Sequence, residues 1–264
     1  MAPLQVTSAE EKKLYDLGKA RSEHKKALAK ANLRERPPNA AESSLIHSMW
    51  LQRALSDPND LNHLPSSVHT MASTRIHNTT IMQPEFRNKS HFTIFGGFLM
   101  KSTFELAFCC AASFARARPS FVSLDPSTFM SPVPVGSVLY LTAVVAYTDP
   151  PLVVEGKVSD EETGSATGKT SDTKPNQDEP NEDGNPARSQ QTRVQIRVDS
   201  HVRDVEHGHR KPAGQFNYTF TVDKDVKVIP ETYQEYVMYL DARRRVDQVE
   251  VDLGKRKVAD MVGQ

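Results

Sequence analysis

The pattern of apolar positions is dominated by one stretch, residues 96–115, in which apolar side chains surround a predicted helix almost completely. They are Leu99, Leu106 and Cys110 on one side and Phe98, Phe104, Phe108, Ala111 and Ala115 over much of the rest. Because such a helix has no polar face, it is expected in the interior of a fold. Only Lys101 and Glu105, four residues apart, form a polar strip along it. The rest of the chain is therefore expected to pack around this helix.

Strand patterns lie on both sides of the helix in the sequence. They cover residues 68–82, 121–129, 138–147, 194–202 and 216–222, and in the last two apolar and polar side chains alternate. Residues 138–147 are apolar on both faces, as in a central strand that is covered on both sides. The economical packing is one antiparallel sheet of five strands wrapped around the central helix. The sequence therefore predicts an α+β architecture of the hotdog type.

Three further helices are predicted outside the sheet. Capping boxes at residues 8–11 and 39–42 start two of them before the first strand, and the first is basic and mostly solvated. Trp50, the single tryptophan, is expected to anchor the second helix on the domain. The last helix begins at Pro230, and a polar C-terminal tail is expected from residue 241 onward.

These elements divide the chain into three parts. Residues 1–66 form a helical connector or extension, residues 67–240 form the hotdog domain, and residues 241–264 form the C-terminal tail. Within the domain, residues 156–190 contain a single Val and no Ile, Leu, Met or aromatic residue. Such a segment buries too little apolar surface to offset the entropy of ordering, so a disordered insertion is expected there.

Composition and charge exclude several classes of protein. The 33 basic Lys and Arg residues balance the 33 acidic ones, so no global field points to nucleic acid, and an anionic ligand requires a local basic patch. Cys109 and Cys110 are adjacent and cannot form an ordinary disulfide, which indicates small core residues in a reducing compartment. No apolar run reaches the roughly 18 residues that a membrane span needs. Neither a signal peptide nor a transit peptide is visible at the N-terminus.

Two short motifs suggest chemistry. Gly96 and Gly97 open the buried helix, where the missing side chains let a ligand or another backbone approach closely. The free N–H groups there, with the positive end of the helix dipole, suit an oxyanion or a polarised carbonyl; a purely steric role is the alternative. His207 and His209 lie in the hairpin turn at 206–214 without a third ligand nearby, so no metal site is predicted.

Several motifs together resemble the mitochondrial acyl-CoA thioesterase 9/10 family, whose subunits carry two hotdog domains. They are Pro84–Asn88, Ile94–Met100 and Phe104–Ala107, supported by residues 129–137, 216–220 and 233–241. The resemblance covers roughly residues 40–245 and is to the second, C-terminal hotdog; residues 1–66 resemble the connector between the two domains. The first hotdog is absent, so the chain resembles half of the usual subunit.

The resemblance implies the hydrolysis of fatty acyl-CoA to a free fatty acid and CoA, with no cofactor, because CoA is part of the substrate. In related enzymes with two hotdogs, an Asn from one domain meets a carboxylate from the other across their interface. By resemblance this chain supplies Asn88. The carboxylate commonly lies on the central helix, at the position that Phe104 occupies here, so the missing half would supply the acid.

Candidate roles follow for the residues near the helix start. The Gly97 N–H is the candidate oxyanion donor. Asn88 would orient the attacking water or the carbonyl, with capping of the loop as the alternative. His91 is a candidate to hydrogen-bond the substrate, although an exposed loop histidine is the favoured interpretation. Glu105 is a candidate general base, with pairing to Lys101 or to a partner domain as the alternative. The CoA phosphates and adenine need a cationic rim beside Gly96. Its candidates are Arg87, Lys89, Arg193 and Arg197.

The sequence therefore favours an acyl-CoA thioesterase that acts as a homodimer or beside another hotdog domain, with neither nucleic acid nor a membrane span involved. The alternative is a catalytically incomplete half that dimerises or binds acyl-CoA without turnover, and Phe104 is its best support. A hotdog hydratase is disfavoured, because no Asp-x-Asn-Pro-x-His stretch occurs. The resemblance implies a mitochondrial location; with no visible transit peptide, a cytoplasmic one stays open.

Overall fold

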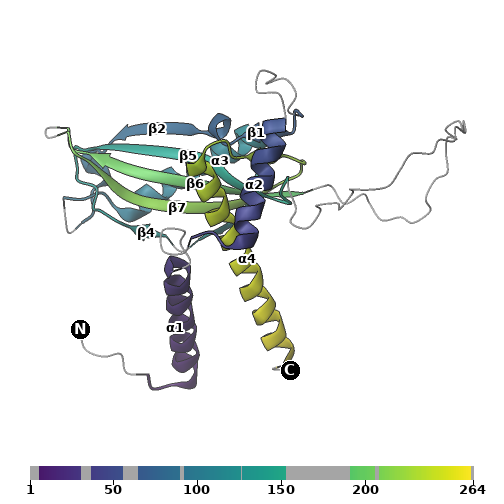
Figure 1. Cartoon of the computed structure of the whole chain (residues 1–264). Helices are drawn as coiled ribbons and strands as arrows, with labels where there is room; N and C mark the ends of the chain where they lie inside the picture. The colour runs from purple at the N-terminus through teal and green to yellow at the C-terminus, as the bar shows by residue number, and fades with distance from the viewer. Residues whose placement is uncertain are drawn as a thin grey trace, which may run out of the picture.

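A computed structural model describes residues 6–30, 37–55, 65–89, 92–125, 127–152, 191–205 and 208–262. The insertion predicted at 156–190 lies outside the described residues. The described part is one antiparallel sheet with a long helix on each side of it (Figure 1).

The sheet has six strands in the order β2-β5-β6-β7-β3, with β4 paired to β7. The strands are β2 (Ile76–Ile81), β3 (Ser120–Leu124), β4 (Thr128–Phe129), β5 (Val138–Asp149), β6 (Thr192–Arg203) and β7 (Arg210–Val222). Every pairing in this sheet is antiparallel. The central helix α3 (Gly96–Ala115) lies across one face, which confirms the hotdog architecture predicted from the sequence.

The register of the strands separates two faces. The "helix face" carries Leu141, Ile196 and Tyr218 and packs against α3, while the "outer face" carries Arg197 and Asn217. On the helix face the core is apolar, because the inward positions of β5, β6 and β7 are almost all Leu, Val, Ile, Ala, Phe or Tyr. The prediction of a central strand covered on both sides is confirmed for β5, whose residues 143–148 are all buried.

The outer face is covered by the last helix, α4 (Tyr233–Val262), with α2 (Ala40–Leu55) beside it (Figure 1). Tyr239 of α4 packs edge-on against Tyr147 of β5, with ring centroids 5.0 Å apart. Arg244 of α4 donates two hydrogen bonds of 2.6 Å to the carboxylate of Glu42 on α2. These contacts hold both helices on the sheet.

The expectation of a polar tail from residue 241 is wrong, because α4 continues to Val262. Leu240, Ala242 and Val246 are buried, so the helix keeps an apolar side beyond residue 241. Asp241 also pairs with Arg245 at 2.8 Å, one turn later on the same helix. The charged residues in 241–245 therefore belong to the polar side of a helix that packs on the domain.

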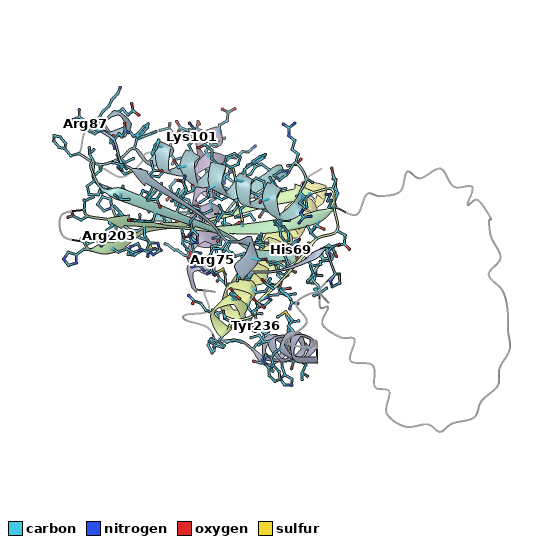
Figure 2. The ribbon with its side chains drawn as sticks, turned by 90° about the horizontal axis from the view of Figure 1, so that it is seen from above. His69, Arg75, Arg87, Lys101, Arg203 and Tyr236 are labelled. Atoms are coloured by element: carbon cyan, nitrogen blue, oxygen red, sulfur yellow. The ribbon has the colours of Figure 1, made fainter. Side chains whose placement is uncertain are left out.

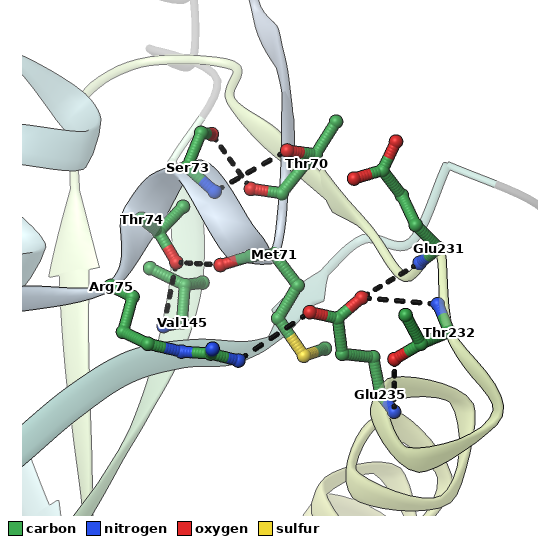
Figure 3. A network of polar contacts seen from close by, with 9 residues as sticks. All are labelled: Thr70, Met71, Ser73, Thr74, Arg75, Val145, Glu231, Thr232 and Glu235. Atoms are coloured by element: carbon green, nitrogen blue, oxygen red, sulfur yellow. Dashed lines mark hydrogen bonds and ion pairs between the residues drawn. The ribbon is translucent and has the colours of Figure 1, made fainter.

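The strand predicted over residues 68–82 is divided in two. β1 (Val68–Thr70) pairs in parallel with β8 (Lys227–Ile229), and a 3-10 turn, η2 (Ala72–Thr74), precedes β2. Thr74 fixes this turn, since its hydroxyl donates to the Met71 carbonyl at 2.8 Å and accepts the N–H of Val145 at 3.1 Å (Figure 3). Arg75 then pairs with Glu235 near the start of α4, at 3.5 Å.

The two N-terminal helices start as predicted. The capping box of α1 (Ala9–Lys30) joins Ser8 and Glu11, and that of α2 joins Asn39 and Glu42. α1 extends away from the sheet and its described side chains are exposed (Figure 1).

The expectation that Trp50 anchors α2 is wrong. The residue is 52% exposed and stacks on His47 of its own helix, while Leu45 and Met49 are buried. The smaller side chains at 45 and 49 lie on the side of α2 that faces the domain, and Trp50 follows on the neighbouring side.

By length and composition alone, α3 is long and apolar enough to cross a membrane. It contains no unbroken apolar run of that length, because Lys101 and Glu105 interrupt the sequence. The core helix of a globular fold has the same length and composition. Here the apolar side of α3 contacts β5, β6 and β7.

Candidate active site

The loop before α3 is folded back against the start of the helix. The N–H of Asn88 donates to the Thr93 carbonyl at 2.8 Å, and the N–H of Phe95 donates to the Phe86 carbonyl at 2.9 Å. Phe86 also stacks on Phe98 in the first turn of the helix, with centroids 3.9 Å apart. These contacts place the half-buried Asn88 opposite Thr93, which precedes Gly96 by three residues in the chain.

Aromatic rings crowd the helix start at Gly97, whereas Gly96 has room for an ordinary contact. A Cβ on Gly97 would lie 2.3 Å from Cε1 of Phe95, and one on Gly96 would lie 3.4 Å from Cζ of Phe129. Phe95 is the N-cap residue and its side chain makes no capping hydrogen bond. Among the described residues, the N–H groups of Gly96 and Gly97 meet no acceptor, so both are available to a ligand oxygen.

Glu105 lies elsewhere on α3. It is eight residues beyond Gly97, which corresponds to about 12 Å along a helix. Its side chain is 60% exposed and pairs with Lys101 at 3.7 Å. Within this chain, therefore, the structure does not bring Glu105 to the glycine pair.

Phe104 is half-buried and belongs to an aromatic cluster between α3 and the sheet. Its ring lies 5.4 Å from Phe121, 5.8 Å from Tyr218 and 6.0 Å from Phe220, measured between centroids. Edge-on ring packing of this kind stabilises beyond simple burial. The position at which the resemblance implies a carboxylate is thus filled by a packing residue.

The four cations proposed as a rim fall into two groups. Arg87 and Lys89 are exposed in the loop before α3, and the Arg87 guanidinium lies 5.3 Å from the Phe92 ring centroid. Arg193 and Arg197 lie on the outer face, where they pair with Asp149 at 3.7 Å and with Asp199 at 3.0 Å. The sheet separates them from the glycine pair, because the alternation along β6 directs odd-numbered side chains away from α3.

A buried polar pair on the helix face was missed by sequence analysis. The hydroxyls of Thr103 and Tyr218 share a hydrogen bond of 2.8 Å, and the Tyr218 hydroxyl also donates to the Met100 carbonyl at 3.2 Å. Burial raises the pKa of Tyr218, so the phenol stays protonated at neutral pH. A tyrosine at an inward position of β7 was the available signal, because a buried phenol normally finds a partner.

The cysteines differ from each other. Cys110 is buried, as predicted, and its thiol donates to the Thr74 carbonyl at 3.3 Å. Burial raises its pKa to about 12, which removes it as a nucleophile near neutral pH. Cys109 is exposed, so the prediction of a core residue is wrong for it; it lies on the side of α3 that faces away from the sheet.

No group of three potential metal ligands occurs in the described part of the chain. His91, proposed to contact substrate, lies outside the described residues, as does His207.

The central helix, the sheet around it and the glycine pair beside a polar loop define a protein of the hotdog class. Solved structures agree with this fold. An acyl-CoA hydrolase from Staphylococcus aureus in complex with butyryl coenzyme A, coenzyme A and coenzyme A disulfide has a TM-score of 0.52 at 20% identity, covering 75% of this chain and 99% of that one. An acyl-CoA hydrolase from Bacillus cereus also has a TM-score of 0.52, at 18% identity, covering 75% of this chain and 98% of that one.

The chain is similar in sequence to the mitochondrial acyl-CoA thioesterases 9 and 10, as its motifs predicted. It is 29% identical over 252 residues to human acyl-coenzyme A thioesterase 9 and 27% identical over 260 residues to mouse acyl-coenzyme A thioesterase 10, both mitochondrial. The alignments cover 94% and 97% of this chain but 47% and 49% of the relatives, so the chain spans about half their length. No protein-family profile matches the chain.

Proposed function

We propose that this chain is one hotdog of an acyl-CoA thioesterase, which hydrolyses fatty acyl-CoA to a fatty acid and CoA. The observation that carries the proposal is the alignment of nearly the whole chain with acyl-CoA thioesterases 9 and 10. The N–H groups of the glycine pair, which meet no acceptor among the described residues, would polarise a thioester carbonyl near the half-buried Asn88. Whether the matching segment is the C-terminal half of the relatives stays a prediction.

In the proposed reaction a water molecule attacks the carbonyl carbon of the thioester. The carbonyl oxygen gains negative charge, which the Gly97 N–H and the positive end of the α3 dipole stabilise. The C–S bond then breaks, CoA leaves as a thiolate that takes up a proton, and the acyl group becomes a carboxylic acid. Asn88 would orient the water or the carbonyl.

The base that activates water is proposed to come from a second hotdog. Phe104 is packed among aromatic rings, and Glu105 lies two turns beyond Gly97, where it pairs with Lys101. β2 is an edge strand whose second side is unpaired in the described structure, and exposed apolar side chains stand near the helix start. These are Ile81, Phe92, Phe95 and Phe129. An open sheet edge with exposed apolar neighbours favours pairing with another copy or with a separate hotdog.

The test is the release of CoA thiol from acyl-CoA by the purified full chain. Asn88→Ala is expected to lower turnover by about 100-fold, the size of effect seen for one polarising donor. Asn217→Ala is the matched control, because Asn217 lies on the outer face, and its turnover is expected to equal that of the unaltered chain. Equal rates for both variants would contradict the role of Asn88.

The second candidate is a half that binds acyl-CoA without turnover, and the aromatic packing of Phe104 favours it. Acyl-CoA binding by calorimetry, with no CoA release at any protein concentration, would establish this candidate. Turnover that rises more than in proportion to protein concentration would instead support an active site completed by a second copy.

We also propose a mitochondrial location, since the relatives named above are mitochondrial. A fluorescent fusion of the complete gene product, compared with a mitochondrial marker, tests it. Diffuse cytoplasmic fluorescence would contradict the proposal.

A further inference from the structure

A cavity of about 900 Å³ lies at the end of the sheet where α3 begins. One wall is the 131–137 loop, and the other is formed by the end of β6 and the start of β7. The same loop contacts the candidate active site, because the N–H of Ile94 donates to the Val133 carbonyl at 2.8 Å and that of Val135 donates to the Phe92 carbonyl at 3.1 Å. The cavity and the polar loop around Asn88 therefore share a wall.

The cavity has an apolar side and a basic side. Pro134, Val135, Val202 and other apolar side chains form most of its lining, while Lys211 and His209 stand on the hairpin side. Among the described lining residues Asp204 is the one acid. The structure records no carboxylate partner for Lys211 among the described residues, so its ammonium is available to a ligand.

More positive charge surrounds this end of the sheet. Arg203 and Arg210 belong to the same hairpin, and Arg210 lies 5.8 Å from the ring centroid of Tyr140, which holds its guanidinium in place. Figure 2 shows Arg87 and Arg203 at the same end of the molecule, on opposite sides of the sheet. Glu85 is the nearby exposed acid in the loop before α3. The strand register directs Arg203 and Arg210 to the outer face, so the basic residues that line the cavity itself are Lys211 and His209.

We propose that this cavity binds the CoA part of the substrate, with the pantetheine arm along the 131–137 loop and the phosphates at Lys211 and His209. The proposal rests on the thioesterase function and names cations that replace Arg193 and Arg197 of the sequence prediction. An acyl chain would gain nothing from the cationic side, whereas a long, mostly apolar arm that ends in phosphates matches both parts of the lining. A volume of this size suits a ligand larger than a short acyl group.

The test compares CoA, dephospho-CoA and pantetheine binding to the full chain by calorimetry. Lys211→Ala is expected to weaken CoA binding by about five- to tenfold, as loss of one charge-assisted contact does, and to leave pantetheine binding unchanged. The loss should shrink at high salt, since the contact is exposed. Lys19→Ala, which removes an exposed lysine on α1, is the control and should bind CoA like the unaltered chain.

A second variant tests whether CoA or the acyl chain occupies the cavity. Val135→Phe fills the cavity beside the loop, so it should weaken free CoA and pantetheine alike. If it weakens long-chain acyl-CoA while free CoA binds as before, the acyl chain occupies the cavity and the proposal is overturned. CoA affinity that is unchanged in Lys211→Ala overturns it equally.

The two proposals fail in different ways. A chain that binds CoA through Lys211 but never releases CoA from acyl-CoA would contradict the thioesterase function and keep the binding site. Turnover with the same KM in Lys211→Ala and in the unaltered chain would keep the function and remove the site.

Discussion

The two faces of the sheet are covered by the same kind of element, a long helix, but by different interactions. α3 is held on the helix face by apolar and aromatic contacts, with the Thr103–Tyr218 hydrogen bond between the two layers. On the outer face, ion pairs join α4 to α2 and to the sheet side, as in Arg244 with Glu42 and Arg245 with Asp125. α3 is therefore positioned by packing, whereas α4 combines buried apolar contacts, such as Tyr239 on Tyr147, with ion pairs.

This difference bears on where chemistry can take place. A close-packed aromatic interior has no room for a hydrated carboxylate, since burying an unpaired charge is costly. Around the middle of α3, the half-buried Phe104 fills the position of the implied carboxylate with ring contacts to Phe121, Tyr218 and Phe220. Reactive groups are instead gathered at the beginning of the helix, where the backbone N–H groups, Asn88 and the cavity lie together.

The largest effect is expected from breaking the helix face at Phe104. Phe104→Ala should lower the free energy of unfolding by about 3 kcal/mol, because it removes a ring that touches three others and leaves a cavity. Urea unfolding followed by circular dichroism measures the loss. Phe92→Ala is the control, since that ring is exposed, and it should cost far less. A loss below about 1 kcal/mol for Phe104→Ala would mean that α3 is not held by this cluster.

Much of the helix face could be predicted from the sequence, because buried positions are occupied by apolar residue types. A helix that is apolar on nearly every side has one stable location, and the alternation in 194–202 and 216–222 gives the inward side chains of β6 and β7. The same reasoning placed Cys110 in the core.

The contacts on the outer face could not be predicted in this way. In the sequence, the charges of Asp241, Arg244 and Arg245 are typical of a solvated tail. The two arginines pair with Glu42 and Asp125, which are far away in the sequence, so these ion pairs could not be predicted. For the same reason Arg193 and Arg197 were assigned to a ligand rather than to Asp149 and Asp199. The cationic hairpin at 203–211 was missed, because its role follows from a cavity that several loops form together.

A smaller but still large effect is expected from breaking the charge contact on the outer face. Arg244→Met should cost about 2 kcal/mol at pH 7, since it leaves Glu42 without its two hydrogen bonds at a site where the side chains are 19% and 13% exposed. Urea unfolding of both proteins measures this. Arg21→Met on the exposed helix α1 is the control and should change stability little.

The same pair gives a pH dependence. The hydrogen bonds from Arg244 lower the pKa of Glu42 below its usual 4.5. A carboxyl with a lowered folded-state pKa stabilises the fold above its unfolded pKa, and this stabilisation is lost as the pH falls through the folded value. The difference in unfolding free energy between the unaltered chain and Glu42→Gln should therefore be largest near neutral pH and shrink below pH 4.5. A difference that stays constant down to pH 3 would contradict the role of the ionised pair.

A moderate effect is expected at the polar contact within the apolar face. Tyr218→Phe should lower the free energy of unfolding by about 1 kcal/mol, the usual net value of one hydrogen bond. The loss is limited because the Thr103 hydroxyl keeps the Leu99 carbonyl as an acceptor at 3.0 Å. Tyr233→Phe is the matched control, since Tyr233 is exposed. Equal stability of Tyr218→Phe and the unaltered chain would show that this hydrogen bond does not help to fix α3 on the sheet.

The smallest effect is expected on the exposed side of α3. Glu105→Gln should change the free energy of unfolding by less than about 0.5 kcal/mol, because Glu105 and Lys101 are both largely exposed and surface ion pairs contribute little. Its rate of CoA release should also be unchanged, since the carboxylate lies two turns from Gly97. Asn88→Ala, measured beside it, should lose most of its activity. If Glu105→Gln instead loses turnover while its stability and CoA affinity are kept, a partner hotdog must cover α3 and bring this carboxylate to the substrate. The exposed side of the helix would then belong to the active site, and the contrast between a packed helix face and a reactive helix start would have to be given up.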